Sequence, residues 1–263
     1  MSHVGDHHHL GTALLKKGDL EGAIAEFRND ARLNPNDVCA HSSLGFALQK
    51  QGDLKGAIAE YRAALCLNPD SVEIHCCLGT ALQKKEDYEG AIAEYRAALR
   101  LDPNDVTSHY NLGTALHRKG DFGEAIAKYR AALDLGSNHV DAHYGLGTAL
   151  KKTGDTEEAI AEYYVALRLD PNHVRAHYNL GNSLQDKNDL EGAIAEYRAA
   201  LHLNPNHGDT HYNLGSALHT KGDMVAARME YKKALMLIPK TSANQLRIKA
   251  IKSIVSRLAG PMR

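Results

Sequence analysis

The chain has 263 residues and a net charge of −1, because 31 lysine and arginine residues face 32 aspartate and glutamate residues. This balance argues against wholesale binding to nucleic acid or to membrane surfaces, and we expect neither as a partner. No apolar run approaches the roughly 20 residues that cross a bilayer, and residues 1–6 lack the basic and apolar regions of a secretory signal, so we expect a cytoplasmic protein.

A leucine followed by a glycine recurs every 34 residues. The leucines of these pairs are Leu10, Leu44, Leu78, Leu112, Leu146, Leu180 and Leu214. A fixed period of this size indicates a stack of copied units rather than a globule with one central core. We therefore divide residues 1–241 into seven repeats, at 4–37, 38–71, 72–105, 106–139, 140–173, 174–207 and 208–241. Residues 242–263 are expected to form a capping helix and a tail.

Each repeat predicts two helices joined by a tight turn, as residues 106–139 illustrate. Val106–Lys119 carries apolar or small residues at a helical spacing. Gly120 ends this helix, because glycine adopts a left-handed conformation at little cost. Asp121, an aspartate in every repeat, is suited to cap the second helix, which in six repeats stops near a proline.

Four residues depart from the common pattern or add to it. We expect Glu124 and Glu158 to complete capping boxes at the second helices of their repeats. Glu86 takes the place of the turn glycine and is expected to strain or reshape the turn of repeat three. Asp30 stands where the other repeats have alanine, and a carboxylate at a packed position is costly unless it is exposed or paired. We therefore expect repeat one to be a frayed end, or a place where another chain docks.

The Leu-Gly pair, the small residues, the aromatic residue of the second helix and the terminal proline together resemble the tetratricopeptide repeat family across residues 4–241. The resemblance implies an all-α fold of seven helix-turn-helix repeats, wound into a right-handed α-solenoid, or superhelix, with a concave groove lined by the first helices. Histidine stands where the family usually has tryptophan, and we expect it to pack against the preceding repeat. These register histidines are His7, His41, His75, His109, His143, His177 and His211.

The sequence contains none of the motifs that usually mark a catalytic centre. A phosphate-binding glycine loop, a nucleophile elbow and a His-Glu-x-x-His helix are all absent, so we expect no enzyme activity and no cofactor. Three histidine pairs stand one helical turn apart, but zinc sites use three or four protein ligands, so we expect no metal site. The pairs are His139 with His143, His173 with His177, and His207 with His211. Four cysteines follow no repeat register and are expected to stay reduced: Cys39, Cys66, Cys76 and Cys77.

The positions expected to face the groove form columns of similar residues from repeat to repeat. A tyrosine column comprises Tyr110, Tyr144, Tyr178 and Tyr212, and beside it stand Asn111, Asn179 and Asn213, then Thr114, Thr148 and Asn182. A basic column comprises Lys16, Lys50, Lys84, Arg118 and Lys152. The asparagine column, interrupted at Gly145, is similar to the ladder in the repeat region of O-GlcNAc transferases, where such amides hold an extended peptide backbone. An amide both donates and accepts, which suits peptide groups of any sequence.

We expect a non-catalytic scaffold that binds a peptide segment of a partner protein in the groove. Tyrosine with asparagine is a common recognition chemistry, and the basic column suits an acidic segment. Two other functions stay open. Regular repeats can self-assemble through their terminal units, and the chain can be the repeat subunit that targets an enzyme complex.

Overall fold

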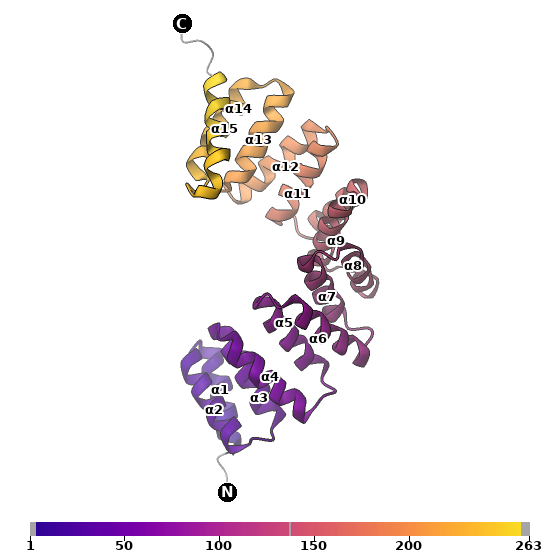
Figure 1. The fold of residues 1–263 in the computed structure, drawn as a ribbon, viewed down its shortest axis with the longest axis vertical. Helices are drawn as coiled ribbons and strands as arrows, with labels where there is room; N and C mark the ends of the chain where they lie inside the picture. The colour runs from indigo at the N-terminus through magenta and orange to yellow at the C-terminus, as the bar shows by residue number, and fades with distance from the viewer. Residues whose placement is uncertain (1–3, 137, 259–263) are drawn as a thin grey trace. The chain divides into compact units, whose positions relative to one another are not determined.

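The computed structural model describes residues 4–136 and 138–258, with side chains from residue 7 onward. Within these residues every regular element is helical, so the expected all-α class is confirmed. The chain divides into two compact units, Met1–Ser137 and Asn138–Arg263. Each unit is a row of helical hairpins in chain order (Figure 1).

The first unit consists of four helical hairpins in its described part. Their helices are α1 (Val4–Lys17), α2 (Leu20–Leu33), α3 (Val38–Gln51), α4 (Leu54–Leu67), α5 (Val72–Lys84), α6 (Tyr88–Leu101), α7 (Val106–Lys119) and α8 (Phe122–Leu135). Each helix packs on the next in sequence, and α3 and α5 also touch, as do α5 and α7. The first helices of consecutive hairpins, α3, α5 and α7, therefore form one continuous side of this unit.

The second unit continues the same arrangement and ends with an additional helix. Its described helices are α9 (Val140–Thr153), α10 (Thr156–Leu169), α11 (Val174–Asp186), α12 (Leu190–Leu203), α13 (Gly208–Lys221), α14 (Met224–Leu237), the short 3₁₀ helix η1 (Ser242–Asn244) and α15 (Gln245–Arg257). The first helices α9, α11 and α13 touch one another along one side, and α15 packs on α14 (Figure 1). The expected C-terminal helix is thus present.

The core of each hairpin is an aromatic ring packed on a glycine. The ring of Tyr197 lies so close to the Leu-Gly glycine, Gly181, that an added Cβ would stand 2.6 Å from its Cε1 atom. All seven rings at this register are at most 3% exposed: Phe27, Tyr61, Tyr95, Tyr129, Tyr163, Tyr197 and Tyr231. Burying one such ring contributes about 1.5–3 kcal/mol. The ring therefore packs between the two helices of its own hairpin.

The turn inside each hairpin depends on one residue with positive φ. Glycine fills this position in five hairpins, whereas Glu86 has φ 65° and Asn188 has φ 62°. The helices before these two residues, α5 and α11, have 13 residues where the other first helices have 14. The turn at Glu86 is thus reshaped, one of the two outcomes expected for it. A left-handed conformation costs an ordinary side chain about 1–2 kcal/mol.

At the starts of the second helices, the capping differs in part from the sequence prediction. In five hairpins the aspartate caps the second helix, as Asp189 does by accepting from the backbone N–H of Gly192 at 3.0 Å. The expected capping boxes are wrong, since Asp121 and Asp155 make no side-chain cap bond. Glu124 instead binds Arg96 of the preceding hairpin through both carboxylate oxygens, at 2.9 Å.

Asp30 is buried, and within the described residues only one of its two oxygens accepts a hydrogen bond. It is 1% exposed, its Oδ1 accepts from Nδ2 of Asn34 at 2.9 Å, and its Oδ2 lies 3.4 Å from Nδ1 of His8. The carboxylate is therefore partly satisfied inside its own repeat. That repeat one is a frayed end, or a place where another chain docks, remains a prediction.

Candidate interaction surface

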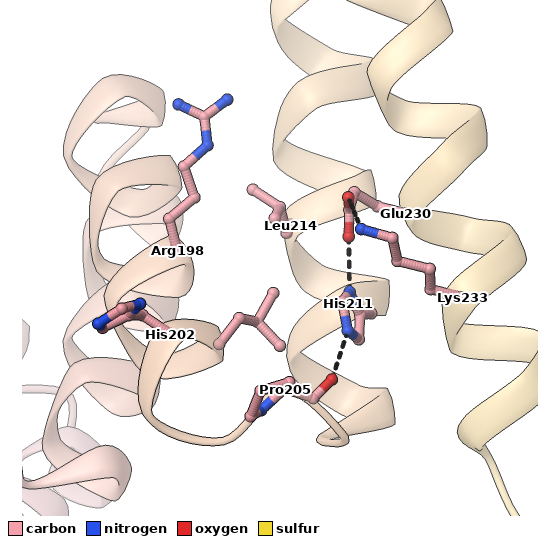
Figure 2. Close-up of a pocket in the computed structure, with 8 residues that line it drawn as sticks. Arg198, His202, Pro205, His211, Leu214, Glu230 and Lys233 are labelled. Atoms are coloured by element: carbon pink, nitrogen blue, oxygen red, sulfur yellow. Dashed lines mark hydrogen bonds and ion pairs between the residues drawn. The ribbon is translucent and has the colours of Figure 1, made fainter.

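Register histidines join hairpins within each unit to the loops that precede them. His211 contacts Glu230 of its own hairpin through Nδ1, at 2.6 Å, and the carbonyl oxygen of Pro205 through Nε2, at 2.9 Å (Figure 2). His41, His75 and His177 make the same two contacts with their own glutamate and proline. These histidines thus contact the preceding repeat, as expected, and the glutamate is the partner that sequence reasoning missed. A pocket of about 420 Å³ lies beside His211, but both of its ring nitrogens are already used by the protein.

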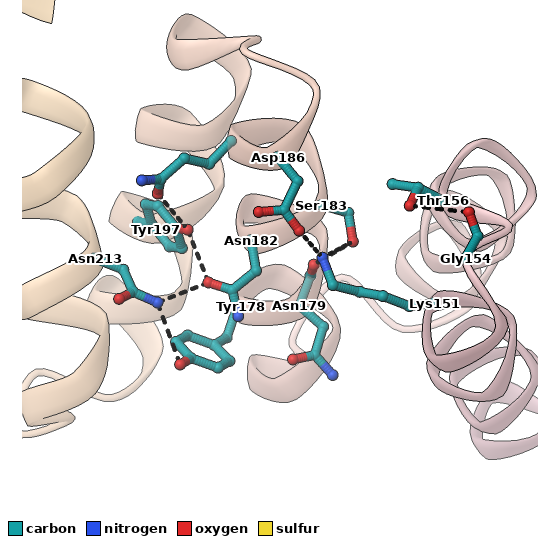
Figure 3. A network of polar contacts seen from close by, with 11 residues as sticks. Lys151, Gly154, Thr156, Tyr178, Asn179, Asn182, Ser183, Asp186, Tyr197 and Asn213 are labelled. Atoms are coloured by element: carbon teal, nitrogen blue, oxygen red, sulfur yellow. Dashed lines mark hydrogen bonds and ion pairs between the residues drawn. The ribbon is translucent and has the colours of Figure 1, made fainter. Parts of the chain in front are cut away.

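The tyrosine and asparagine columns meet across neighbouring hairpins of the second unit. Nδ2 of Asn179 donates to the hydroxyl of Tyr144 at 3.1 Å, and Nδ2 of Asn213 donates to the hydroxyl of Tyr178 at 3.2 Å. Each bond joins residues 35 positions apart. Figure 3 shows Asn213 between Tyr178 and Asn182. The amide N–H groups that the sequence offers to a peptide are therefore partly used to join one hairpin to the next.

Asn182 forms the centre of this network. Its Oδ1 accepts from Nδ2 of Asn213 at 2.7 Å and from the hydroxyl of Tyr197 at 2.8 Å (Figure 3). Burial raises the pKa of Tyr197 above its ordinary value, so the hydroxyl stays protonated and can donate. This hydroxyl has one proton, and Oε1 of Gln185, 2.9 Å away, also accepts from it. The bond from Asn213 is therefore the one that fixes the orientation of Asn182. Within the described residues, the Oδ1 atoms of Asn179 and Asn213 have no bonded partner, and both side chains are half-buried.

A pocket of about 420 Å³ opens beside these residues, lined by Tyr144, Val174, Arg175, Tyr178, Asn179, Asn204, His207 and Asp209. The guanidinium of Arg175 lies 5.2 Å from the ring centroid of Tyr144, and the His207 ring lies 5.3 Å from that of Tyr178. The pocket therefore combines aromatic faces, an exposed cation, a half-buried carboxylate and an amide oxygen. Val174, Arg175, Asn204, His207 and Asp209 line the pocket, but the sequence prediction, which followed the repeated columns, did not include them among the groove residues.

The remaining candidate residues have different surroundings. The hydroxyl of Thr148 donates to the carbonyl of Tyr144 at 2.6 Å, and that of Thr114 donates to the carbonyl of Tyr110 at 3.0 Å. Both threonines thus donate to their own helices. Tyr212 lies under Arg247 of α15, whose guanidinium is 4.7 Å from its ring centroid. Arg247 also binds Asp209, at 2.5 Å, so α15 covers this end of the tyrosine column.

The basic column is exposed, but it is divided between the two units. Lys50, Lys84 and Arg118 lie near the ends of α3, α5 and α7, and Lys152 lies near the end of α9. No carboxylate partner is found for these four cations in the described ranges. Asn111 lies in α7. The tyrosine that would bond to it, by analogy with Asn179 and Tyr144, would stand at position 76, which is a cysteine.

The first unit has a different, more apolar pocket. Its volume is about 380 Å³, and it is lined by Thr12, Leu15, Phe27, Ser42, Ser43, Phe46, Tyr61, Glu73, Ile74 and Cys77. Phe46 is 41% exposed, and the ammonium group of Lys50 lies 5.3 Å from its ring centroid. Phe46 replaces a polar residue of the third column. That single replacement was a signal in the sequence, and the interpretation overlooked it.

The histidine pairs do not converge on a common point. Nδ1 of His173 accepts from the backbone N–H of Ala176 at 3.0 Å and caps α11, while His177 contacts Glu196 and Pro171. Across residues 4–136 and 138–258, no three histidine, cysteine or acidic side chains are grouped closely enough to hold a metal ion. In the same ranges, no helix has the length and hydrophobicity needed to span a membrane.

Family comparisons agree over most of the chain. A model described as Tetratricopeptide repeat matches residues 78–139 and 120–174, and another of the same description matches residues 208–241. A model described as TPR repeat matches residues 11–52, 50–86 and 181–222. None of the curated protein sequences searched matches the chain.

Several solved structures share the fold. YrrB, described as a TPR protein with an unusual peptide-binding site, is 25% identical, with a TM-score of 0.61 over 73% of this chain and 97% of YrrB. A MamA structure is 28% identical, with a TM-score of 0.58 over 60% of this chain and 93% of MamA. A tetratricopeptide repeat protein from Parabacteroides merdae is 16% identical, with a TM-score of 0.71 over 98% of this chain and 99% of that protein.

Proposed function

The chain belongs to the tetratricopeptide repeat family of protein-interaction scaffolds, and we propose that it acts without catalysis by binding a peptide segment of a partner protein. The segment would lie over α9, α11 and α13, where Tyr144, Tyr178, Asn179 and Asn213 meet. The observation that carries the proposal is the pair of tyrosine–asparagine bonds between neighbouring hairpins. Together with the bond from Asn213 to Asn182, they use both N–H groups of Asn213 and one of the two of Asn179. The two amide oxygens stay available to accept from a peptide backbone.

Preorganisation favours this surface over an ordinary solvated face. Asn213 is held by both Tyr178 and Asn182, so its oxygen is oriented before a ligand arrives. Binding to fixed groups avoids part of the entropy cost of ordering side chains. The similarity to YrrB, whose description names a peptide-binding site, supports the same class of ligand.

The preference for an acidic segment rests on unpaired cations. Arg175 lies in the pocket over Tyr144, and Lys152 is exposed on α9. Asp209 lines the same pocket but binds Arg247. An acidic side chain beside Tyr144 would therefore meet Arg175, and complementary charge would mainly raise its association rate.

The test begins with peptides selected from a displayed random library on the wild-type chain. Their dissociation constants are then measured by fluorescence anisotropy with the double variant Asn179→Ala and Asn213→Ala. We expect roughly a tenfold or larger loss of affinity, as for the removal of two hydrogen-bond acceptors. The matched control is Asn172→Ala together with Asn206→Ala, which removes two asparagines from exposed loops of the same unit. Selected peptides that bind the double variant as tightly as the wild type would overturn the proposal.

A further inference from the structure

The second helix of the last hairpin, α14, presents an apolar stripe that the other hairpins lack. Val225, Met229 and Met236 are 75%, 56% and 81% exposed. They lie at i, i+4 and i+11, so they follow one side of the helix for about 16 Å.

Comparison within the chain shows that the repeat pattern does not require this stripe. At the register of Val225, the six other second helices have glutamate, lysine or glycine, and at that of Met229 all six have alanine. At the register of Met236 they have arginine, histidine, aspartate or cysteine. In α10, for example, the three positions hold Glu157, Ala161 and Arg168. Exposed apolar side chains grouped on one helix face are typical of interaction sites.

The charges around the stripe have one sign. Between Met224 and Leu258, Glu230 is the sole acidic residue, against eight lysines and arginines, although the whole chain carries a net charge of −1. Glu230 is used by His211 and Lys233. Lys232 and Lys240 are exposed beside the stripe, and in the described part of the chain no carboxylate pairs with them.

A basic pocket lies beyond the end of α14. It has a volume of about 350 Å³ and is lined by Lys240, Gln245, Ile248, Lys249 and Lys252. Lys240 follows the end of α14 at Leu237 by three residues and borders this pocket together with Lys249 and Lys252.

We propose that α14 is a second docking site, separate from the groove of the first helices, and that its partner is an acidic amphipathic helix of another protein. The apolar face of that helix packs on Val225, Met229 and Met236, and its carboxylates meet Lys232 and Lys240. Methionine suits this task, since its flexible, polarizable side chain adapts to a partner helix. An RNA strand fits less well, because it needs exposed aromatic rings for stacking, and Tyr231, the aromatic residue of α14, is buried.

Methionine methyl groups give a direct test on the wild-type chain. The probe is a synthetic peptide of about 18 residues, five helical turns, with leucine along one face and glutamate elsewhere. A peptide of the same composition, permuted to lack an apolar face, is its control. In NMR spectra of protein labelled at the methionine methyls, we expect the signals of Met229 and Met236 to shift with the first peptide alone. Unshifted signals would overturn the proposal.

Two sets of variants complete the test. The triple variant Val225→Glu, Met229→Ala and Met236→Arg gives α14 the residues that α10 already has, so it is expected to fold and to lose roughly tenfold or more in affinity. Lys232→Glu with Lys240→Glu should weaken binding in a salt-dependent way. The Asn179 and Asn213 double variant should bind this peptide like the wild type. Unchanged affinity of the triple variant, or tighter binding to phosphatidylglycerol vesicles or single-stranded RNA than to the peptide, would contradict the proposal.

Discussion

The imidazole of His177 lies between two hydrogen-bond acceptors, with Nδ1 2.6 Å from the carboxylate of Glu196 and Nε2 2.9 Å from the carbonyl oxygen of Pro171. A neutral imidazole carries one N–H group and satisfies one of these contacts, whereas the protonated ring satisfies both. The hydrogen bond with Glu196 raises the pKa of His177 above 6.5, burial opposes this, and the contact with Pro171 adds to it. The charged ring is thus favoured in the folded state.

From this we predict that the chain becomes less stable as the pH rises above 6.5. Since the folded pKa of His177 exceeds the unfolded value, its contribution is complete below pH 6.5 and is lost as the pH rises through the folded pKa. The pKa of His41 is also raised, because contacts with Glu60 and Pro35 outweigh the effect of burial. Thermal unfolding followed between pH 5.5 and 8.5 should show a falling melting temperature. Replacing Glu196 by Gln should reduce this slope, and an unchanged slope would refute the assignment.

Lys128 offers a converse experiment. It occupies the place of the glutamate in the fourth hairpin, and Nδ1 of His109 is buried there without a bonded partner in the described residues. We expect Lys128→Glu to supply that partner and to raise the free energy of unfolding by about 1 kcal/mol at pH 6. Chemical denaturation of the two proteins measures the gain. Lys128→Gln separates the hydrogen bond from the charge, and a glutamate variant less stable than the wild type would be the contrary outcome.

Gly181 is predicted to tolerate no side chain. A Cβ at this position would lie 2.6 Å from the ring of Tyr197, which is 1% exposed and has no room to withdraw. Gly181→Ala should therefore cost about 1–3 kcal/mol of stability through overpacking. Gly123 is the control, because a Cβ there meets nothing within 4 Å. At that site alanine should stabilise α8 by about 0.5–1 kcal/mol, and urea denaturation of both variants decides whether the two effects have opposite signs.

The buried carboxylate of Asp30 predicts a stabilising substitution. The six other repeats have alanine at this register, and each is at most 1% exposed. We expect Asp30→Ala to raise the melting temperature, because a buried carboxylate is costly even when paired and alanine fits this packing site. The reverse change, Ala64→Asp, should destabilise the chain. Asn68 would be available to the new carboxylate, as Asn34 is to Asp30, but Ser42 stands at the position that corresponds to His8. Differential scanning calorimetry measures both, and a lower melting temperature for Asp30→Ala would contradict the prediction.

Most of the helical architecture could be predicted from the sequence, because one register repeats glycine, aspartate, aromatic and proline residues whose effects on the backbone are local. Gly120 and Asp121 each act within a few residues, so their roles follow from position alone. The left-handed conformation of Glu86 could be foreseen for the same reason.

The candidate site was less predictable, because its contacts join residues about one repeat apart. The bond between Asn179 and Tyr144 depends on how two neighbouring hairpins pack, which no single repeat specifies. The cover that Arg247 places over Tyr212 comes from a helix outside the repeated pattern. Glu124 was misassigned because Arg96, in the preceding hairpin, competes for its carboxylate with the helix terminus.

The contacts of the register histidines reach six residues back and nineteen residues forward, and they have the same form at four junctions. The histidine, the proline carbonyl and the glutamate of one such junction therefore lie within one 34-residue length of chain. A duplicated segment of that length carries all three groups. A chain shortened or lengthened by one whole unit would keep each of these junctions chemically complete. Adding a repeat by duplication therefore leaves no histidine junction without its partners, whereas an insertion inside a globular core would disrupt the packing around it.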